Sequence, residues 1–467
     1  MANLGQHAKE CVKKGRIIYN KCNLIADKSL ILQSKKCAKR KRFAPKNCLI
    51  GNKGCVMIIS RLDYINYRGL RTGCINFDPR LTVVVGKNGS GKSSVLQAVA
   101  TAVSWIVARI RSEKGVGLYV DDLSVTNGHQ NAQIVATFDE FGSVIIPNKT
   151  KSGLPKRYGI DLNGLRGYSN EIREQLEASN FQSSVPVFAL YGVKRAVIDI
   201  PLRIRNTEEH MLETYKDCLN GAAKFRDFFM WFRNQEDLEN ELRLDEEGNE
   251  TFSSRELSAF RRAMLGFMPE YTNVRVRRKP LRMTVKKNGE ELNVAQLSDG
   301  EKIYLALIGD LCRRLVLANP TLEDPLNGRG IVMIDEVDLH LHPKWQGEVA
   351  QRLMDVFPNL QFIITTHSSQ VINRVATDKL RILGDGEVRT ADYSYGMPTN
   401  VVLKDIMGVE SEQPIEVVEA FDNVYTAIAE GNLQRAQQLL NELVAKVPSH
   451  PELTRIRRIV EKNARRV

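Results

Sequence analysis

The sequence contains no apolar run that approaches the roughly 18 to 20 residues needed to cross a bilayer. Its first residues hold only very short apolar stretches, so we expect no signal peptide there. Pairs of the CxxC type are also missing among the five cysteines between Cys11 and Cys55, which leaves a zinc site with little support. We therefore expect a cytoplasmic protein with reduced thiols and no membrane contact.

Excess positive charge is missing from most of the chain. Residues 1–56 hold 11 Lys and 3 Arg against Glu10 and Asp27, which accounts for the whole formal charge of +12 and leaves the remaining residues balanced. A basic segment can bind a phosphate backbone or stay a solvated arm. Because Met57 directly precedes the first strand-like segment, we expect residues 1–56 to be a disordered basic tail without a function of its own.

What the chain does have is the composition of a globular protein, with 43% hydrophobic and 26% charged residues over 467 positions. That length suits one large α/β domain with a smaller helical unit. Residues 206–271 are dominated by Glu, Arg, Leu, Phe and Trp with one turn-like interruption, which predicts two helices in an inserted arm. The expected parts are the tail (1–56), an N-terminal lobe (57–205), the helical arm (206–272), a C-terminal lobe (273–399) and a helical region for oligomerisation or partner docking (400–467).

The most specific motif is GKNGSGKS, Gly86–Ser93, which follows an apolar strand and precedes a helix, as a phosphate-binding loop requires. Its glycines let successive backbone N–H groups turn toward an anion, and the helix N-terminus adds partial positive charge. We expect Lys92 to reach the β- and γ-phosphates of ATP and the Ser93 hydroxyl to ligate Mg²⁺. The expected nucleotide contacts in this loop are Asn88, Gly89, Ser90, Gly91, Lys92, Ser93 and Ser94.

A second motif, GIVMIDEVDLHLHP (Gly330–Pro343), places two carboxylates after a buried strand. Ligands bind at the carboxyl ends of strands in open α/β sheets. Asp335 is expected to lie in the outer sphere of Mg²⁺, and Glu336 is placed to polarise the attacking water. A further strand ends in Thr366-His367-Ser368, where His367 is predicted to sense the γ-phosphate.

The string LSDGEK, Leu297–Lys302, precedes the paired carboxylates by about one helix. Ser298 and the Gly300 backbone can donate hydrogen bonds to a ligand at a helix N-terminus. The same string is also an ordinary helix cap, with Glu301 in the first turn.

These four motifs, in this order, resemble those of the ABC ATPases, and the long insertion before LSDGEK resembles the SMC-like branch. The resemblance implies an α/β head that dimerises head to tail. Ser298 and Gly300 of one chain would then face the nucleotide that is bound by the other chain. The residues expected to bind that nucleotide are Lys92, Ser93, Asp335, Glu336 and His367. It also implies that Asp338 links the two sites and that Arg68, in NYRGL, touches the nucleotide. Proteins of this class have a glutamine that contacts Mg²⁺ at the end of the strand after the phosphate-loop helix. The corresponding segment here, VPVFALYGVKRAV, has no glutamine at its end, and Gln133 and Gln182 both remain candidates. We therefore expect slow ATP turnover.

The segments NYRGL, YGVKRAV and DLHLHP are similar to those of the ATPase subunit of the Septu anti-phage system and its retron-associated relatives, over about residues 57–400. That resemblance implies a separately encoded HNH nuclease as partner, with DNA bound through the complex. Residues 401–467 are too few for the Toprim nuclease domain of the related OLD-type proteins. The alternative is a RecF-like repair ATPase that clamps DNA.

Two segments of the sequence each allow two interpretations. The segment Arg275–Lys287 has seven basic residues, which suits either a solvated edge hairpin or a DNA-facing role. The C-terminal helices, broken at Pro448 and Pro451, carry more apolar positions than a hairpin can bury, so we expect them to need a partner surface. That surface is either the head itself or another subunit, which would give an assembly larger than a dimer.

Overall fold

The computed structural model describes residues 57–149, 161–196, 210–245, 252–384, 387–408 and 414–464. The predicted tail, residues 1–56, lies outside them.

A seven-stranded sheet forms the centre of the head, in the order β15-β14-β3-β13-β12-β7-β8. Its strands in that order are β15 (Glu387–Arg389), β14 (Leu380–Gly384), β3 (Leu81–Gly86), β13 (Leu360–Thr365), β12 (Gly330–Ile334), β7 (Val187–Ala196) and β8 (Gly221–Ala223). Strands β3, β13, β12 and β7 pair in parallel. Every residue of β3, β12 and β13 is buried, because helices cover both faces of a parallel sheet, and the carboxyl ends of these strands meet at one edge.

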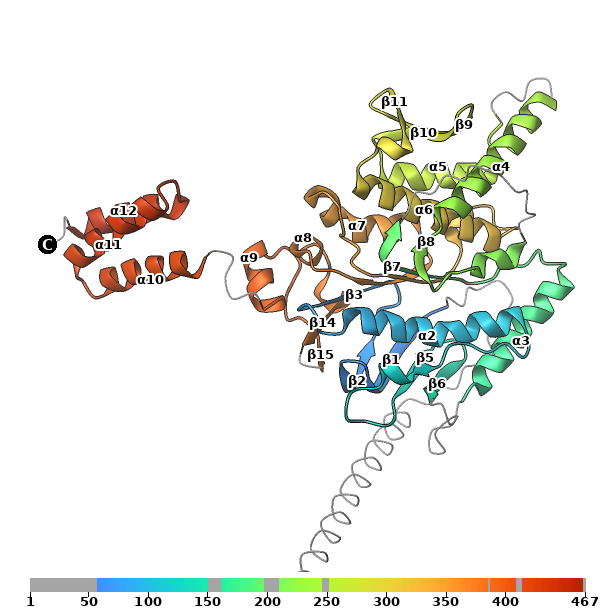
Figure 1. Cartoon of the computed structure of the whole chain (residues 1–467), viewed down its shortest axis with the longest axis horizontal. Coiled ribbons are helices and arrows are strands. Elements are labelled where there is room, and N and C mark those ends of the chain that lie inside the picture. The colour runs from blue at the N-terminus through green and yellow to red at the C-terminus, as the bar shows by residue number, and fades with distance from the viewer. Residues whose placement is uncertain are drawn as a thin grey trace, which may run out of the picture. The chain divides into compact units, whose positions relative to one another are not determined.

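Helix α2 (Lys92–Arg111) lies along one face of this sheet, and α6 (Asp299–Ala318) and α7 (Pro343–Val356) lie along the other (Figure 1). Helix α2 is the one helix of the described residues that is long and apolar enough to cross a membrane by length and composition. Within its most apolar window, 72% is buried inside the protein, which is the environment of a core helix.

A second, five-stranded sheet packs beside α2 in the order β2-β1-β5-β6-β4. Its strands are β2 (Leu70–Asn76), β1 (Ile59–Tyr67), β5 (Gln133–Phe138), β6 (Gly142–Lys149) and β4 (Val120–Asp121). Helix α3 (Asn163–Ala178) contacts both α2 and β6. The side chain of Gln361 joins the two sheets, since its Oε1 accepts from the Ile59 amide at 2.9 Å and its Nε2 donates to the Asp78 carbonyl at 2.8 Å.

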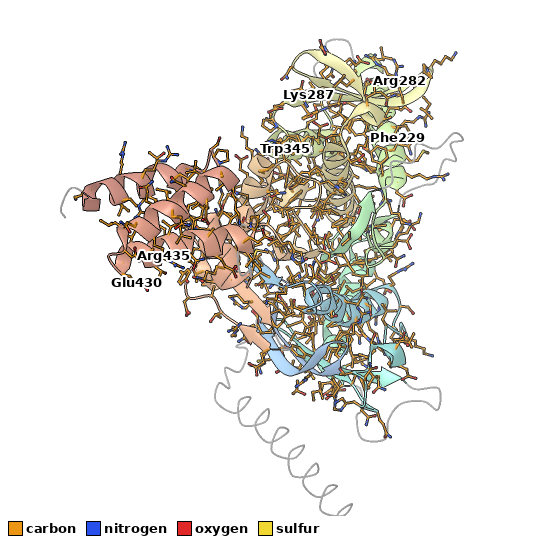
Figure 2. The ribbon with its side chains drawn as sticks, turned by 60° about the vertical axis from the view of Figure 1, so that its left-hand side comes forward. Phe229, Arg282, Lys287, Trp345, Glu430 and Arg435 are labelled. Atoms are coloured by element: carbon orange, nitrogen blue, oxygen red, sulfur yellow. The ribbon has the colours of Figure 1, made fainter. Side chains whose placement is uncertain are left out.

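The inserted helices, α4 (Phe225–Asp245) and α5 (Arg255–Phe267), pack against α6 instead of standing apart from the head. The Phe228 ring lies 5.1 Å from that of Phe260 and occupies the space where a Cβ on Gly309 of α6 would sit. Figure 2 shows Phe229, another buried aromatic residue of this insertion, on α4. The aromatic residues that marked this segment in the sequence therefore serve to bury it. Its exposed leucines are few and include Leu244 near the end of α4 and Leu265 on α5.

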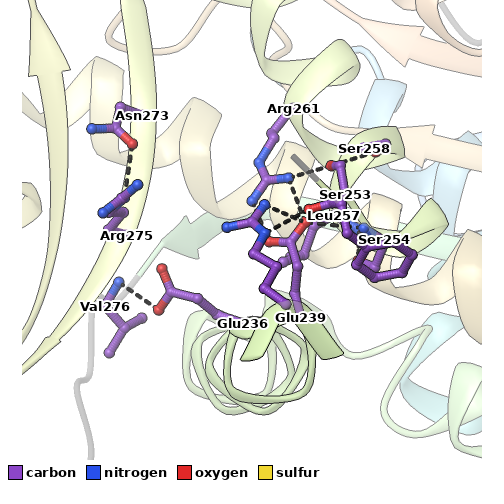
Figure 3. A network of polar contacts seen from close by, with 12 residues as sticks. Glu236, Glu239, Ser253, Ser254, Leu257, Ser258, Arg261, Asn273, Arg275 and Val276 are labelled. Atoms are coloured by element: carbon purple, nitrogen blue, oxygen red, sulfur yellow. Dashed lines mark hydrogen bonds and ion pairs between the residues drawn. The ribbon is translucent and has the colours of Figure 1, made fainter. Parts of the chain in front are cut away.

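A three-stranded sheet, β9 (Tyr271–Arg278), β10 (Leu281–Lys287) and β11 (Glu290–Asn293), follows the insertion. Buried carboxylates of α4 hold the neighbouring elements (Figure 3). Glu239, 1% exposed, accepts from both terminal nitrogens of Arg261 on α5, at 2.9 and 2.7 Å. Glu236 accepts from the Val276 amide of β9 at 3.1 Å. The insertion and the small sheet are thus one hydrogen-bonded unit.

The C-terminal helices bury their apolar positions among themselves. Helices α10 (Ile415–Ala429), α11 (Leu433–Lys446) and α12 (Pro451–Ala464) share a separate core. Its buried members are Phe421, Val424, Ala427, Ala436, Leu440, Leu443, Leu453, Ile456 and Val460. The expectation that these positions need a partner surface was therefore wrong, because it compared them with a hairpin, whereas the third helix closes the core.

Candidate nucleotide site

The loop after β3 has the backbone that its glycines predict. Gly89 and Gly91 have φ of 78° and 102°, in the left-handed region that favours glycine. A Cβ on Gly91 would lie 2.8 Å from Leu70 Cδ2, so the tip of the β1–β2 hairpin adjoins this loop. Helix α2 begins directly after Gly91, with Ser93 exposed and Ser94 half-buried in its first turn. Asn88 is exposed in the loop, and Ser90 Oγ is buried without a hydrogen-bond partner among the described residues.

Lys92 is fixed over this loop. The residue is 6% exposed, and Nζ donates to the carbonyls of Gly86 at 2.9 Å and Lys87 at 3.0 Å. Burial lowers the pKa of Lys92, and the nearby carboxylates of Asp335 and Glu336 oppose that change. The lysine therefore lies where the phosphate loop meets the paired carboxylates.

The two carboxylate residues follow β12 and are positioned by Thr365, the last residue of β13. Thr365 Oγ1 donates to Asp335 Oδ1 at 2.6 Å and accepts from the Glu336 amide at 2.8 Å. Glu336 has a φ of 47°, which is uncommon for a residue with a side chain. Such strained conformations cluster at active sites, among other places. Thr365 was not predicted from the sequence, where its only signal was its place two residues before His367 at a strand end.

The loops after β12 and β13 are also joined to each other. The Thr366 hydroxyl donates to Asp338 Oδ1 and accepts from the Ser368 amide at 2.9 Å. Ser368 Oγ donates to Gln346 Oε1 of α7 at 2.7 Å. His367 lies half-buried between the two bonded residues. The structure thus brings Asp338 and His367 to the same edge of the sheet as Asp335 and Glu336.

Ser298 and Gly300 lie at the start of α6. Ser298 is exposed and forms a capping box with Glu301: its Oγ accepts from the Glu301 amide at 3.4 Å, and Glu301 Oε2 accepts from the Ser298 amide at 2.7 Å. A Cβ on Gly300 would lie 2.3 Å from the His340 carbonyl oxygen, so the close packing against the DLHLHP segment requires glycine. Within the described residues, no hydrogen bond joins Ser298 to the phosphate loop of its own chain.

Arg68 lies in the turn between β1 and β2, whose residue Leu70 touches the phosphate loop. The side chain is exposed, its φ is 53°, and Nε donates to Ser124 Oγ at 3.2 Å. Its guanidinium carbon lies 5.6 Å from the centroid of the Tyr67 ring. Arg68 is therefore held at the rim of the loop.

The two candidate glutamines lie in different places. Gln182 precedes β7 at its amino end, where Val185 pairs with Ala318, so it lies at the opposite end of the strand from the carboxylates. Gln133 begins β5 and pairs with Ile65 of β1. The residue that reaches the site from β7 is Tyr191, whose carbonyl accepts from the Asp335 amide at 2.7 Å.

Tyr191 also belongs to a buried charge cluster that was not predicted from the sequence. Its hydroxyl donates to Asp310 Oδ2 at 2.8 Å, and Arg314 Nε donates to the same oxygen at 2.7 Å. Arg314, 1% exposed, also donates to the carbonyls of Thr214 and Lys216. Burial raises the pKa of Tyr191 well above its usual value, and the Asp310 charge raises it further, so Tyr191 is a neutral donor. This cluster links β7, next to the carboxylates, with α6, whose N-cap is Ser298.

The basic segment Arg275–Lys287 forms the β9–β10 hairpin, and several of its charges are paired. Arg277 pairs with Glu291, Arg278 with Glu236 and Asp237, and Lys287 with Glu301. These pairs favour a solvated hairpin, and reversing the charge of Arg277 or Arg278 would break them whether or not DNA binds there.

Taken together, the fold and this site are those of an ATPase of the ABC/SMC type. Residues 58–385 match the family described as RecF/RecN/SMC N terminal domain, and the chain belongs to that family. The predicted α/β ATPase head with a helical C-terminal region is thereby confirmed.

Among its relatives, the chain is similar to ATPases of retron and Septu systems. It is 31% identical over 412 residues to the retron Ec83 probable ATPase of Escherichia coli, covering 75% of this chain and 76% of that one. It is 29% identical over 380 residues to the retron Vc95 probable ATPase of Vibrio cholerae serotype O1 biovar El Tor, covering 71% and 74%. The Septu protein PtuA of Bacillus thuringiensis is 22% identical over 419 residues, covering 85% and 96%. The predicted resemblance to this group is confirmed.

Proposed function

We propose that this chain is the ATP-binding and ATP-hydrolysing subunit of an anti-phage defence complex, in which nucleotide-dependent head dimerisation regulates a separately encoded HNH-type nuclease. The observation that carries the ATPase part is the placement of Lys92, after β3, and of Asp335 and Glu336, after β12, at the same carboxyl edge of the central sheet. Relatives in retron and Septu systems support the defence setting.

The residues at this edge fit ATP and Mg²⁺. The glycine loop offers backbone N–H groups at the start of α2, and a buried Ser90 hydroxyl without a partner among the described residues is available to a phosphate oxygen. The hydroxyl of Ser93 is a hard oxygen ligand of the kind that Mg²⁺ prefers, and the carboxylate of Asp335 suits the outer sphere of that ion. Bound ATP and Mg²⁺ supply the γ-phosphoryl group and the charge that neutralises it.

The chain's own residues then have distinct tasks. Lys92 neutralises phosphate charge from above the loop, and Thr365 keeps Asp335 and Glu336 at fixed positions. Glu336 accepts a proton from the attacking water. His367, held between Thr366 and Ser368, faces the γ-phosphate. Arg68 at the rim is placed to touch the nucleotide.

A second copy of the chain would complete the site. Ser298 is exposed at a helix N-terminus, which favours an anion, and Gly300 is buried directly behind it. In a head-to-tail dimer they meet the γ-phosphate bound by the other copy, and Asp338 lies between the two sites. The small, ion-paired basic hairpin gives little support to the alternative, a RecF-like clamp that binds DNA through this chain.

Two substitutions test the proposed ATPase. Lys92→Ala is expected to abolish ATP binding, whereas Glu336→Gln should bind ATP, hold a dimer and lose about 10²–10⁴-fold in turnover. Glu348→Gln, which removes a half-buried carboxylate of α7 that pairs with Arg352, is the matched control and should keep the ATP affinity and turnover of the unchanged protein. ATP affinity, phosphate release and particle mass are measured for each. Wild-type turnover by Glu336→Gln would show that Glu336 is not the general base.

The nuclease partnership has its own test. The chain is co-expressed with an HNH protein encoded beside it, and the complex is isolated in the Lys92→Ala and Glu336→Gln forms. Regulation through the nucleotide predicts that the two forms differ in nuclease activity. Equal activity in both forms would contradict it.

A further inference from the structure

Glu301, in the first turn of α6, makes contacts that its helix cap does not need. Its Oε2 accepts from the Ser298 amide, as in any capping box. Its Oε1 accepts from Lys287 Nζ at 2.8 Å and also from the Tyr271 hydroxyl. Lys287 Nζ in turn lies 5.0 Å from the centroid of the Tyr271 ring. One carboxylate therefore joins the start of α6 to the small sheet.

The two outer partners are fixed relative to each other by strand register. Tyr271 and Lys287 are directly opposed across β9 and β10, at one end of the hairpin. Figure 2 shows Lys287 on this sheet. The same β9 strand is bonded to α4 through Glu236 and Val276. A displacement of α4 would therefore be passed to Glu301 through hydrogen bonds, first to β9 and then from Tyr271 and Lys287.

The contact is partly buried, and both of its charged partners are ionisable side chains. The side chains of Glu301 and Lys287 are 15% and 31% exposed. Burial alone would raise the pKa of Glu301, but the hydrogen bonds from Lys287, Tyr271 and Ser298 outweigh it and lower this pKa to about 2. Hydrogen bonds between ionised partners are shorter and stronger than neutral ones, so this contact holds its geometry near neutral pH.

We propose that Lys287 and Tyr271 are positioning residues of the ATPase, which hold Glu301 and thereby set the orientation in which Ser298 meets the nucleotide of the second copy. This inference rests on the proposed head-to-tail dimer. Neither residue is part of the phosphate loop, so each copy's own ATP binding does not depend on them. Their loss is expected to lower turnover at saturating ATP without changing ATP affinity.

The test compares neighbouring lysines of β10. Lys287→Met removes the charge and keeps the chain length, and Lys286→Met is the matched control, because Lys286 is exposed on the opposite face of the strand. We expect Lys287→Met and Tyr271→Phe to lower kcat about five- to tenfold, with KM and the ATP Kd of the single chain unchanged. Lys287→Arg should restore most of the rate, and the melting temperature should match that of the control.

A further variant separates this inference from the proposed function. Ser298→Arg places a bulky cation at the exposed helix start and should abolish ATP-dependent dimerisation. Full turnover by Ser298→Arg would overturn the head-to-tail dimer itself. If Ser298→Arg is inactive while Lys287→Met and Tyr271→Phe match Lys286→Met, only the positioning role is overturned. A parallel loss of melting temperature and ATP affinity in Lys287→Met would also overturn it.

Discussion

Removing the Tyr191 hydroxyl should destabilise the head more than removing a neighbouring tyrosine hydroxyl of similar burial. In Tyr191→Phe, Asp310 loses a hydrogen bond of 2.8 Å and keeps only that from Arg314 through the same oxygen. The other oxygen, Oδ1, has no partner within the described residues. A hydrogen bond to a charged group contributes about 1.5–3 kcal/mol to the free energy of unfolding. Because that free energy is roughly 5–15 kcal/mol for a whole domain, the loss is measurable.

The control is Tyr215→Phe. Tyr215 is also buried, but its hydroxyl donates to a neutral acceptor, the Pro186 carbonyl, at 2.9 Å, so the expected loss is about 0.5–1.5 kcal/mol. Both variants are unfolded in guanidinium chloride, followed by tryptophan fluorescence, and compared by their midpoints at an unchanged slope. If Tyr191→Phe lowers the free energy of unfolding no more than Tyr215→Phe does, the Asp310 charge does not strengthen the hydrogen bond from Tyr191.

Three further outcomes follow from the described residues. Burial raises the pKa of Glu140 from its usual 4.5 to about 7, so between these pH values the folded protein retains a proton that the unfolded chain has released. The free energy of unfolding should therefore fall as the pH rises through 7, by at most ~3 kcal/mol. Denaturation curves at pH 5 and 8 measure this fall, and Glu140→Gln should flatten it. Residues 414–464 have a core of their own, so this fragment should give a cooperative helical melt in circular dichroism, and a gradual melt would contradict this. A chain that begins at Met57, itself 2% exposed, should keep its ATP turnover, and lost turnover would show that residues 1–56 contribute.

The parts of the site that lie in short contiguous motifs could be predicted from the sequence. The glycine loop, Asp335 with Glu336, and His367 each follow an apolar strand, and parallel strands bring their carboxyl ends to one edge. The insertion was also visible as two helices. Its packing on α6 was not, because an aromatic helix looks the same in sequence whether its neighbour is solvent, a partner or its own head.

The sequence by itself determined the class of ATPase and the carboxylates and lysine at its centre, because local strand–loop–helix segments carry that chemistry. Only the tertiary structure decided which ordinary side chains support it: Thr365 beneath the carboxylates, Asp310 with Tyr191, and Lys287 with Glu301. Threonine, tyrosine and lysine occur throughout any chain, and their partners here lie from 14 to 119 positions away. Such contacts depend on how strands and helices are brought together, and no local pattern of residues marks them.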